Sequence, residues 1–187
     1  MWKCFWDWLA TLPQGSASFV GTVTGSALGL VALLLGALYN ARLNRRRDDR
    51  LRKHERQIIA VALHAELSSI ENSLVGNAHD LTEKPPDVGG SFLVPDVMHS
   101  SHVFQETLPK IGLLDPVTTR KVIDAYILLG QYLQDLTLAG GRMRQDMPSG
   151  RRVVELPTAL VSFSIEYHRR RAGVVKEALD ALSPYLK

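Results

Sequence analysis

The chain has 187 residues, room for one membrane span and one modest domain, with a formal net charge of +3 and a single cysteine. Eight basic and three acidic residues between 42 and 56 give this block a charge of +5, so the rest of the chain sums to −2. A nucleic-acid-binding module would carry its basic patch on the folded body, so this distribution argues against one, and the lone Cys4 excludes an internal disulfide or a cysteine-based metal cluster.

Residues 1–15 read MWKCFWDWLATLPQG and are rich in tryptophan. A tryptophan ring is apolar but its N–H needs a partner, which favours the headgroup region of a bilayer. We therefore expect an interfacial segment on the outer face of a membrane. The alternative is a disordered tail whose tryptophans dip into lipid.

Residues 16–40 are predicted to form a transmembrane helix. The stretch from Phe19 to Tyr39 carries no charged residue and is apolar or small all round. At 1.5 Å per residue it is long enough to cross a hydrocarbon core of about 30 Å.

One face of this span carries glycines spaced mostly four residues apart: Gly21, Gly25, Gly29 and, after Ala32, Gly36. Small residues at this spacing let two helix backbones approach closely in lipid, so we expect self-association through this face. The alternative is that glycine is simply common in membrane helices.

The basic block after the span predicts the orientation. Lysine and arginine remain on the cytoplasmic side of short flanking segments, so the N-terminus should lie outside and the C-terminal bulk inside. Residues 41–56 then form a basic helical stalk whose arginines meet anionic lipid headgroups, or serve only to fix the topology. The residues assigned to this membrane surface are Arg42, Arg45, Arg46, Arg47 and Arg50.

Residues 57–187 are predicted to form a cytoplasmic helical bundle. Helical spacing marks a buried stripe from Ile59 to Leu74, and its members are Ile59, Leu63, Leu67, Ile70 and Leu74. The proline- and glycine-rich residues 76–100 predict a long loop, followed by a short helix that Ser100 or Ser101 caps.

Two further long helices complete the bundle. Asp115-Pro116 predicts an N-cap, and Gly140-Gly141 a stop, for a helix over 116–139. The last helix is expected over 157–182. No stretch alternates long enough to predict a sheet, so the predicted class is all-α, with three long helices, the first continuous with the span, and a short one.

The expected topology sends the 116–139 helix back toward the membrane. The loop 142–152 would then lie nearest the membrane, where its four arginines suit an anionic surface. These arginines are Arg142, Arg144, Arg151 and Arg152.

No strong catalytic or metal-binding motif is found. His99 and His102 form an H-x-x-H pair but lack the further ligands that a metal site needs. His168 lies on the core-facing stripe of the last helix and is interpreted as a packed histidine. Arg169 to Arg171 cannot share one helix face, so a solvated face is favoured over an anion site.

The layout resembles small bacterial inner-membrane proteins with one N-terminal span and a helical cytoplasmic domain. The matching parts are the arginine-rich flank 42–56, AVALHAELSSIENSL (60–74) and LPKIGLLDP (108–116). The resemblance implies the architecture, attaches no activity and adds no catalytic residue.

The sequence thus predicts a non-enzymatic, membrane-tethered interaction or scaffold protein at the cytoplasmic face of a bacterial inner membrane. It would bind itself or a dedicated protein partner and anionic lipid, with no cofactor, metal or nucleic acid. The alternative is a membrane-disrupting or pore-forming effector that assembles through the glycine face.

Overall fold

The computed structural model describes Lys3, Asp7 and residues 14–87, 89–98, 101–144 and 152–186. The chain divides into two compact units, residues 1–51 and 52–187, each of which is described by itself. One 70-residue helix, α2 (Gln14–Glu83), contributes to both. Most of the segment predicted to lie at the outer membrane face, 1–15, falls outside the described residues.

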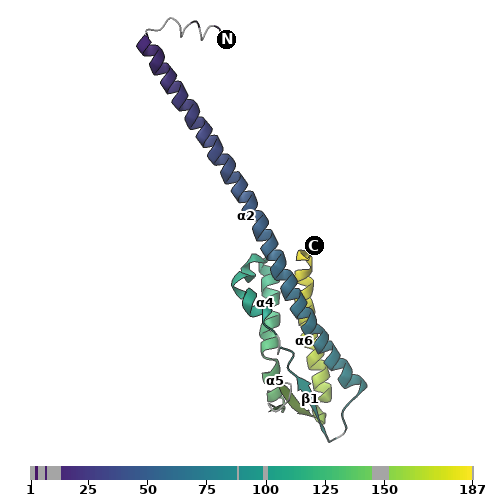
Figure 1. Cartoon of the computed structure of the whole chain (residues 1–187). Coiled ribbons are helices and arrows are strands. Elements are labelled where there is room, and N and C mark those ends of the chain that lie inside the picture. Colours follow the sequence, from purple (N-terminus) through teal and green to yellow (C-terminus); the bar gives the residue numbers. More distant parts are fainter. Residues whose placement is uncertain are drawn as a thin grey trace. The chain divides into compact units, whose positions relative to one another are not determined.

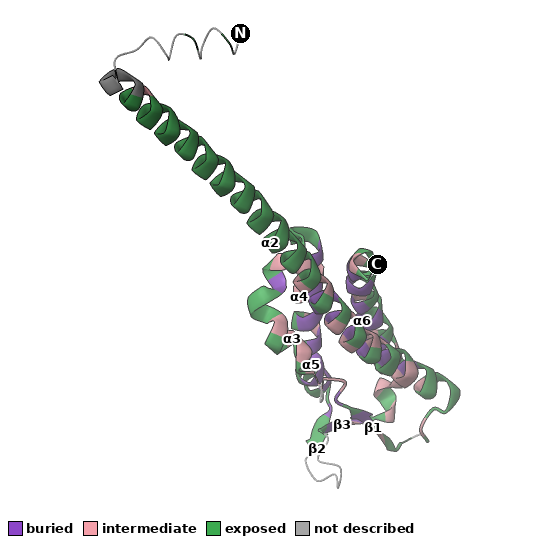
Figure 2. Cartoon of the chain, turned by 45° about the horizontal axis from the view of Figure 1, so that its top comes forward, coloured by how far each residue is buried: buried purple, intermediate pink, exposed green. Residues whose placement is uncertain are grey.

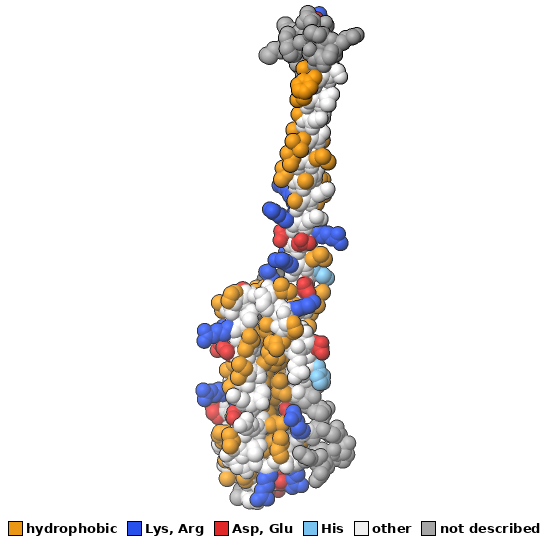
Figure 3. Space-filling view, turned by 90° about the vertical axis from the view of Figure 1, so that its left-hand side faces the viewer, with side chains coloured by type: hydrophobic (Ala, Val, Ile, Leu, Met, Phe, Trp, Pro, Cys, Tyr) orange, Lys and Arg blue, Asp and Glu red, His pale blue; other side chains and the backbone are white. Residues whose placement is uncertain are grey.

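In the first unit, α2 is apolar and exposed. Nearly every described side chain from 18 to 51 is exposed, including Phe19, Leu33 and Leu38. Figure 3 shows hydrophobic side chains along this part of the helix, followed by a group of lysine and arginine side chains. In the described part of the chain, α2 is the one helix long and apolar enough to cross a membrane.

In the second unit, the rest of α2 supplies one wall of the hydrophobic core. The predicted stripe is confirmed, because Ile59, Leu63, Leu67, Ile70 and Leu74 are all buried. Figure 2 shows the buried faces of α2, α4 and α6 turned toward one another. Tyr132 and Leu136, which follow α4 in the chain, belong to the same core.

The remaining helices are shorter than expected. They are α3 (Val103–Thr107), α4 (Pro116–Gly130), α5 (Tyr132–Leu138) and α6 (Val161–Leu182). Three 3-10 turns accompany them, namely η1 (Leu108–Leu113), η2 (Thr158–Leu160) and η3 (Ser183–Tyr185). The helix predicted over 116–139 is therefore interrupted at Gln131, and the last helix begins at Val161. The predicted all-α class is nevertheless confirmed, since 80% of the structure is helical.

A small antiparallel sheet corrects the prediction that none is present. Its strands are β1 (Ser91–Pro95), β2 (Arg142–Arg144) and β3 (Val153–Pro157), in the order β1-β3-β2. Leu93 faces Glu155 and Met143 faces Val154 in the register. The predicted loop 76–100 is wrong in the same region, because α2 continues through Gly76 to Glu83 and β1 follows.

The chain direction also differs from the expected topology. Lys110, just before α4, pairs with Glu55, and Tyr126 within α4 donates to Glu66, so α4 runs parallel to α2. The C-terminal end of α6 returns to the start of α4, where Thr118 Oγ1 donates to the Ala181 carbonyl over 3.2 Å. Figure 1 shows α5 and the strands together at one end of this unit.

The arginines of β2, and Arg152 just before β3, consequently lie where α2 ends, about 40 Å of helix beyond Glu55. Pro95 of β1 lines a pocket with Lys84 and Asp80, which places the sheet beside the last turns of α2. The loop 142–152 was expected near the membrane because the helix 116–139 was expected to run back toward it. That predicted helix direction is wrong. Assigning Arg142, Arg144 and Arg152 to a membrane surface stays a prediction, and Arg151 lies outside the described residues.

Gly140 and Gly141 end α5, as predicted. Gly140 has a φ of +113°, in the region that favours glycine, and its N–H donates to Thr137 O over 3.1 Å. Gly141 N–H donates to Leu136 O over 3.0 Å, which completes the paired bonds of a Schellman motif. A Cβ at Gly141 would lie 2.4 Å from Val154 Cγ1, so the close approach of α5 to β3 requires glycine.

Candidate functional site

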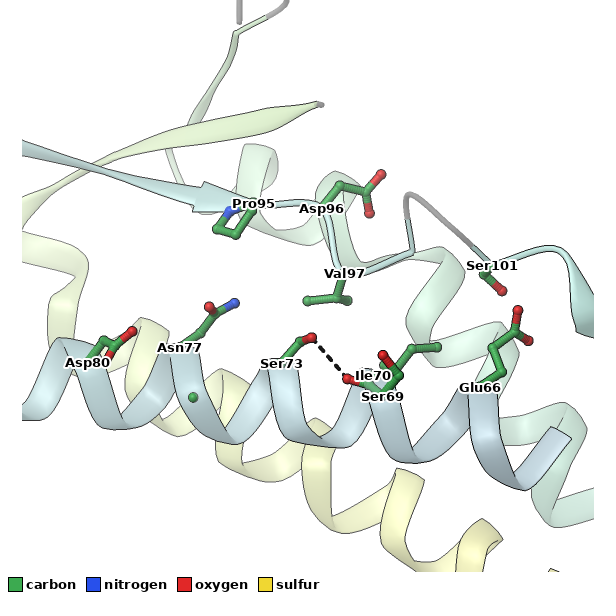
Figure 4. Close-up of a pocket in the computed structure, with 11 residues that line it drawn as sticks. Glu66, Ser69, Ile70, Ser73, Asn77, Asp80, Pro95, Asp96, Val97 and Ser101 are labelled. Atoms are coloured by element: carbon green, nitrogen blue, oxygen red, sulfur yellow. Dashed lines mark hydrogen bonds between the residues drawn. The ribbon is translucent and has the colours of Figure 1, made fainter. Parts of the chain in front are cut away.

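A groove of about 370 Å³ lies between α2 and the chain that follows β1 (Figure 4). Serine, asparagine and carboxylate side chains of α2 face Pro95, Asp96 and Val97 across it. The α2 residues that line it are Glu66, Ser69, Ile70, Ser73, Gly76, Asn77 and Asp80. Two short segments distant in sequence thus form one surface feature.

Glu66 fixes one end of the groove. Its Oε1 accepts the Val103 N–H over 3.0 Å, and its Oε2 accepts the Phe104 N–H over 3.2 Å and the Tyr126 hydroxyl. The Phe104 ring stacks on Tyr126 with centroids 4.0 Å apart. Burial, and then the bond to Glu66, raises the pKa of Tyr126. One carboxylate therefore joins α2 to the start of α3 and to α4.

This arrangement corrects the predicted cap. The N-cap of α3 is His102, which makes no side-chain capping bond, and the first free N–H groups donate to Glu66 instead. Ser101 lines the groove rather than capping the helix. A carboxylate 37 residues earlier in the chain has replaced the local serine.

Asp96 divides the groove from a second pocket. Its side chain is only 2% exposed, and its Oδ2 accepts from Arg152 Nη2 over 2.7 Å, while its Oδ1 accepts the Met98 N–H over 3.0 Å. Asp96, Met98, Ser101 and Arg152 also line a pocket of about 620 Å³ together with leucines of α4 and α5. The ion pair holds the segment between the two hollows in place.

Asn77 places a side-chain amide in the wall of the groove. Its Nδ2 is buried and makes no well-formed hydrogen bond within the part of the chain that the structure describes. It lies near the Tyr132 hydroxyl, whose pKa burial raises and the Asn77 amide lowers. A buried N–H₂ without a well-formed bond is costly, so a shift of this side chain toward a better acceptor is favoured. Asp80 is exposed nearby and offers acceptor oxygens. The groove can thus both donate to and accept from a polar ligand such as a peptide backbone.

A second cluster of polar groups is sealed in the core and serves packing. The predicted packed histidine is confirmed, because His168 is fully buried. Its Nδ1 lies 2.5 Å from the Ser164 carbonyl, so it donates there, and its Nε2 accepts from the Tyr132 hydroxyl at 2.8 Å. Burial lowers the pKa of His168, and the nearby Arg171 lowers it further, so the ring is neutral at pH 7.

The arginine run 169–171 is not a wholly solvated face. Arg169 and Arg170 are exposed, but Arg171 is buried and pairs with Asp135 Oδ2 at 2.5 Å. Its guanidinium also lies 4.0 Å from the ring centroid of Tyr167. The arginine ties α6 to α5, so this part of the prediction is corrected.

The residues predicted for the membrane lie as follows. A Cβ built at Gly21, Gly25, Gly29 or Gly36 would meet nothing within 4 Å, so this face is unfilled. The basic residues are exposed, namely Arg42, Arg45, Arg46, Arg47 and Arg50. In β2, Arg142 is exposed and Arg144 pairs with Glu155 at 2.7 Å. His99 lies outside the described residues, and His102 is exposed.

No protein-family model, curated protein or solved structure matches the chain.

Proposed function

We propose that the protein is a membrane-anchored, non-enzymatic interaction or scaffold protein at the cytoplasmic face of a bacterial inner membrane. The observation that carries the proposal is α2 itself. Its first part exposes an apolar surface that water disfavours, and its last part, from Ile59, supplies core residues to the folded unit. A single helix therefore belongs both to the span and to the unit.

The basic residues after the span support the proposed orientation. The arginines from Arg42 to Arg50 are exposed on α2 immediately after the apolar stretch. Each basic residue near an anionic surface contributes roughly 1 kcal/mol, and such residues stay on the cytoplasmic side. These residues support a cytoplasmic position for the unit 52–187.

The groove between α2 and Asp96 is the proposed contact surface for a protein partner. The Asn77 amide lines the groove as a donor, and the Asp80 carboxylate supplies an exposed acceptor. Glu66 and Asp96 are occupied by intramolecular bonds, so they shape the groove rather than react in it. This arrangement therefore favours binding of a partner through hydrogen bonds over catalysis of a reaction.

Site-specific photocrosslinking in membranes tests this function. A photoreactive amino acid at Asp80, in the groove, should yield one discrete adduct with the full-length chain, and the same group at exposed Lys176 of α6 should not. Asn77→Leu should reduce the adduct several-fold. The absence of any Asp80 adduct from a stably inserted chain, or turnover of a nucleotide or lipid by the purified protein, would contradict the proposal.

A further inference from the structure

We propose that an exposed face of α2 in the second unit packs in parallel and in register against the same face of a second copy. The face, here called the α2 outer stripe, consists of Ile58, Val61, Ala65, Asn72 and Val75. The proposal rests on the proposed function in one respect, because insertion in one orientation brings copies together side by side and parallel.

The outer stripe is apolar but unpartnered. Ile58, Val61 and Val75 are 55%, 47% and 52% exposed, and Ala65 and Asn72 are exposed as well. At about 100° per residue, the stripe lies on the side of α2 opposite to the core residues. Folding of the unit therefore leaves these side chains in water.

The spacing of the stripe is that of a two-stranded coiled coil. Ile58, Ala65 and Asn72 recur every seven residues, and Val61, Ser68 and Val75 occupy the complementary positions, three residues after each of them. Ser68 is half-buried, and its hydroxyl lies 3.4 Å from His64 Nδ1 of the same helix. Asn72 is the one amide among the seam positions, and an asparagine at such a position specifies register by pairing with its own copy. These are the features that a parallel homodimer uses.

Charge favours a second copy as the occupant. In α2 from 57 to 79, the exposed residues include no aspartate, glutamate, lysine or arginine, and the two acidic residues, Glu66 and Glu71, are half-buried. A parallel, in-register pair brings each seam residue against itself, so any charge there would meet a like charge. A face without charges avoids this repulsion, so it can pack against an identical face and needs no partner of opposite charge.

The length of the stripe explains why the membrane is needed. From Ile58 to Val75 it extends for about 26 Å, and a strip one helix wide buries less than the roughly 800 Å² per partner of a standard interface. Anchoring raises the effective concentration of one copy near another, which compensates for a small contact. The pairing should therefore be seen in the bilayer.

Disulfide crosslinking of the full-length chain in membranes tests the stripe directly. In a Cys4→Ser background, single cysteines replace Ile58, Ala65 or, as the matched control, Arg56, which is exposed on α2 but about 180° around the helix from Ala65. A disulfide needs Cα atoms within about 7 Å, which only seam positions reach. Under mild oxidation we expect Ile58→Cys and Ala65→Cys to form dimers at least tenfold faster than Arg56→Cys.

A charge placed in the stripe supplies the second readout. Ala65→Glu should reduce the crosslinking of Ile58→Cys at least fivefold, whereas Arg56→Glu, on the other side of α2, should leave it unchanged. Equal rates at the three cysteines, no dimer at Ile58 and Ala65, or no effect of Ala65→Glu would overturn the pairing. Alkaline extraction of the same membranes separates the two proposals: an extracted chain contradicts anchoring, and an inserted chain without stripe crosslinks contradicts the pairing alone.

Discussion

At the scale of single residues, two carboxylates connect segments by accepting backbone N–H groups. Glu66 accepts those of Val103 and Phe104, and Asp115 accepts those of Val117 and Thr118 at the start of α4. Asp115 also accepts from the Tyr185 hydroxyl at 2.5 Å, which ties the start of α4 to the turn η3 that follows α6. The helix termini are thus held by tertiary as well as local bonds.

Removing the Glu66 carboxylate should destabilise the second unit. Glu66→Leu leaves two backbone N–H groups and a hydroxyl without their acceptor, so we expect a loss of about 2 kcal/mol in the free energy of unfolding. Tyr126→Phe removes one of the three bonds and should cost less. Urea unfolding of the detergent-solubilised chain, followed by tyrosine near-UV circular dichroism, measures both. A Glu66→Leu loss no larger than that of Tyr126→Phe would refute this role.

Asp115 should make stability depend on pH in acid. Hydrogen bonds from Thr118, Tyr185 and the backbone hold the pKa of Asp115 well below its ordinary value of 3.8, so the folded state binds fewer protons than the unfolded state. Its contribution is complete above about pH 5 and decreases as pH falls through 3.8 and below.

The matched substitution is Asp115→Asn, which keeps a good N-cap but cannot titrate. We expect it to flatten the decrease in thermal stability between pH 5 and pH 3, whereas Asp115→Ala should lower stability at every pH. Thermal melts across that range measure the effect, and parallel pH profiles for the wild type and Asp115→Asn would argue against it.

At the scale of elements, the sequence was sufficient to predict features that depend on residues close together in the chain. The Asp115-Pro116 start, the Gly140-Gly141 stop and the buried stripe of α2 are all set by neighbours along one helix. The sheet could not be predicted, because its strands have three to five residues and their pairing joins Ser91 to Pro157. The role of Glu66 was missed for the same reason, since the N–H groups that donate to it lie 37 and 38 residues away.

The junction of α5 and β3 should tolerate no side chain at Gly141. Gly141→Ala would place a Cβ 2.7 Å from Leu136 O and 2.8 Å from Leu156 Cδ2, so we expect a loss of about 1–3 kcal/mol in unfolding free energy. Gly130→Ala, at the end of α4 with open space around it, is the control and should be neutral or slightly stabilising. The same loss for both variants would contradict a steric cause.

The glycine face of the span should govern association within the bilayer. Gly25→Leu fills open space on that face and would push two spans apart, which weakens dispersion contacts that lipid does not replace. Leu33→Ile, off the face, should change little. In a membrane reporter assay, the self-association signal should decrease for Gly25→Leu alone, while insertion into the membrane stays intact. Equal association of the Gly25→Leu and Leu33→Ile variants would mean that the glycines are ordinary residues of a membrane helix and do not mediate packing.

At the scale of the whole molecule, the proposed function requires α2 to anchor the unit 52–187 in a membrane. Sequence and structure agree on one long apolar helix near the N-terminus, since the apolar run and the absence of glycine or proline from 37 to 75 are both visible in the sequence. The direction of α4 was not predictable, because it depends on pairs such as Lys110 with Glu55. The basic residues on α2 support the proposed orientation.

Thiol labelling in bacterial spheroplasts tests anchoring and orientation together. The chain should resist alkaline extraction from the membrane. A membrane-impermeant maleimide should label native Cys4 in intact spheroplasts, and it should label Lys176→Cys in a Cys4→Ser background only after lysis. Labelling of Lys176→Cys in intact spheroplasts, or release of the chain by alkaline extraction, would contradict the account.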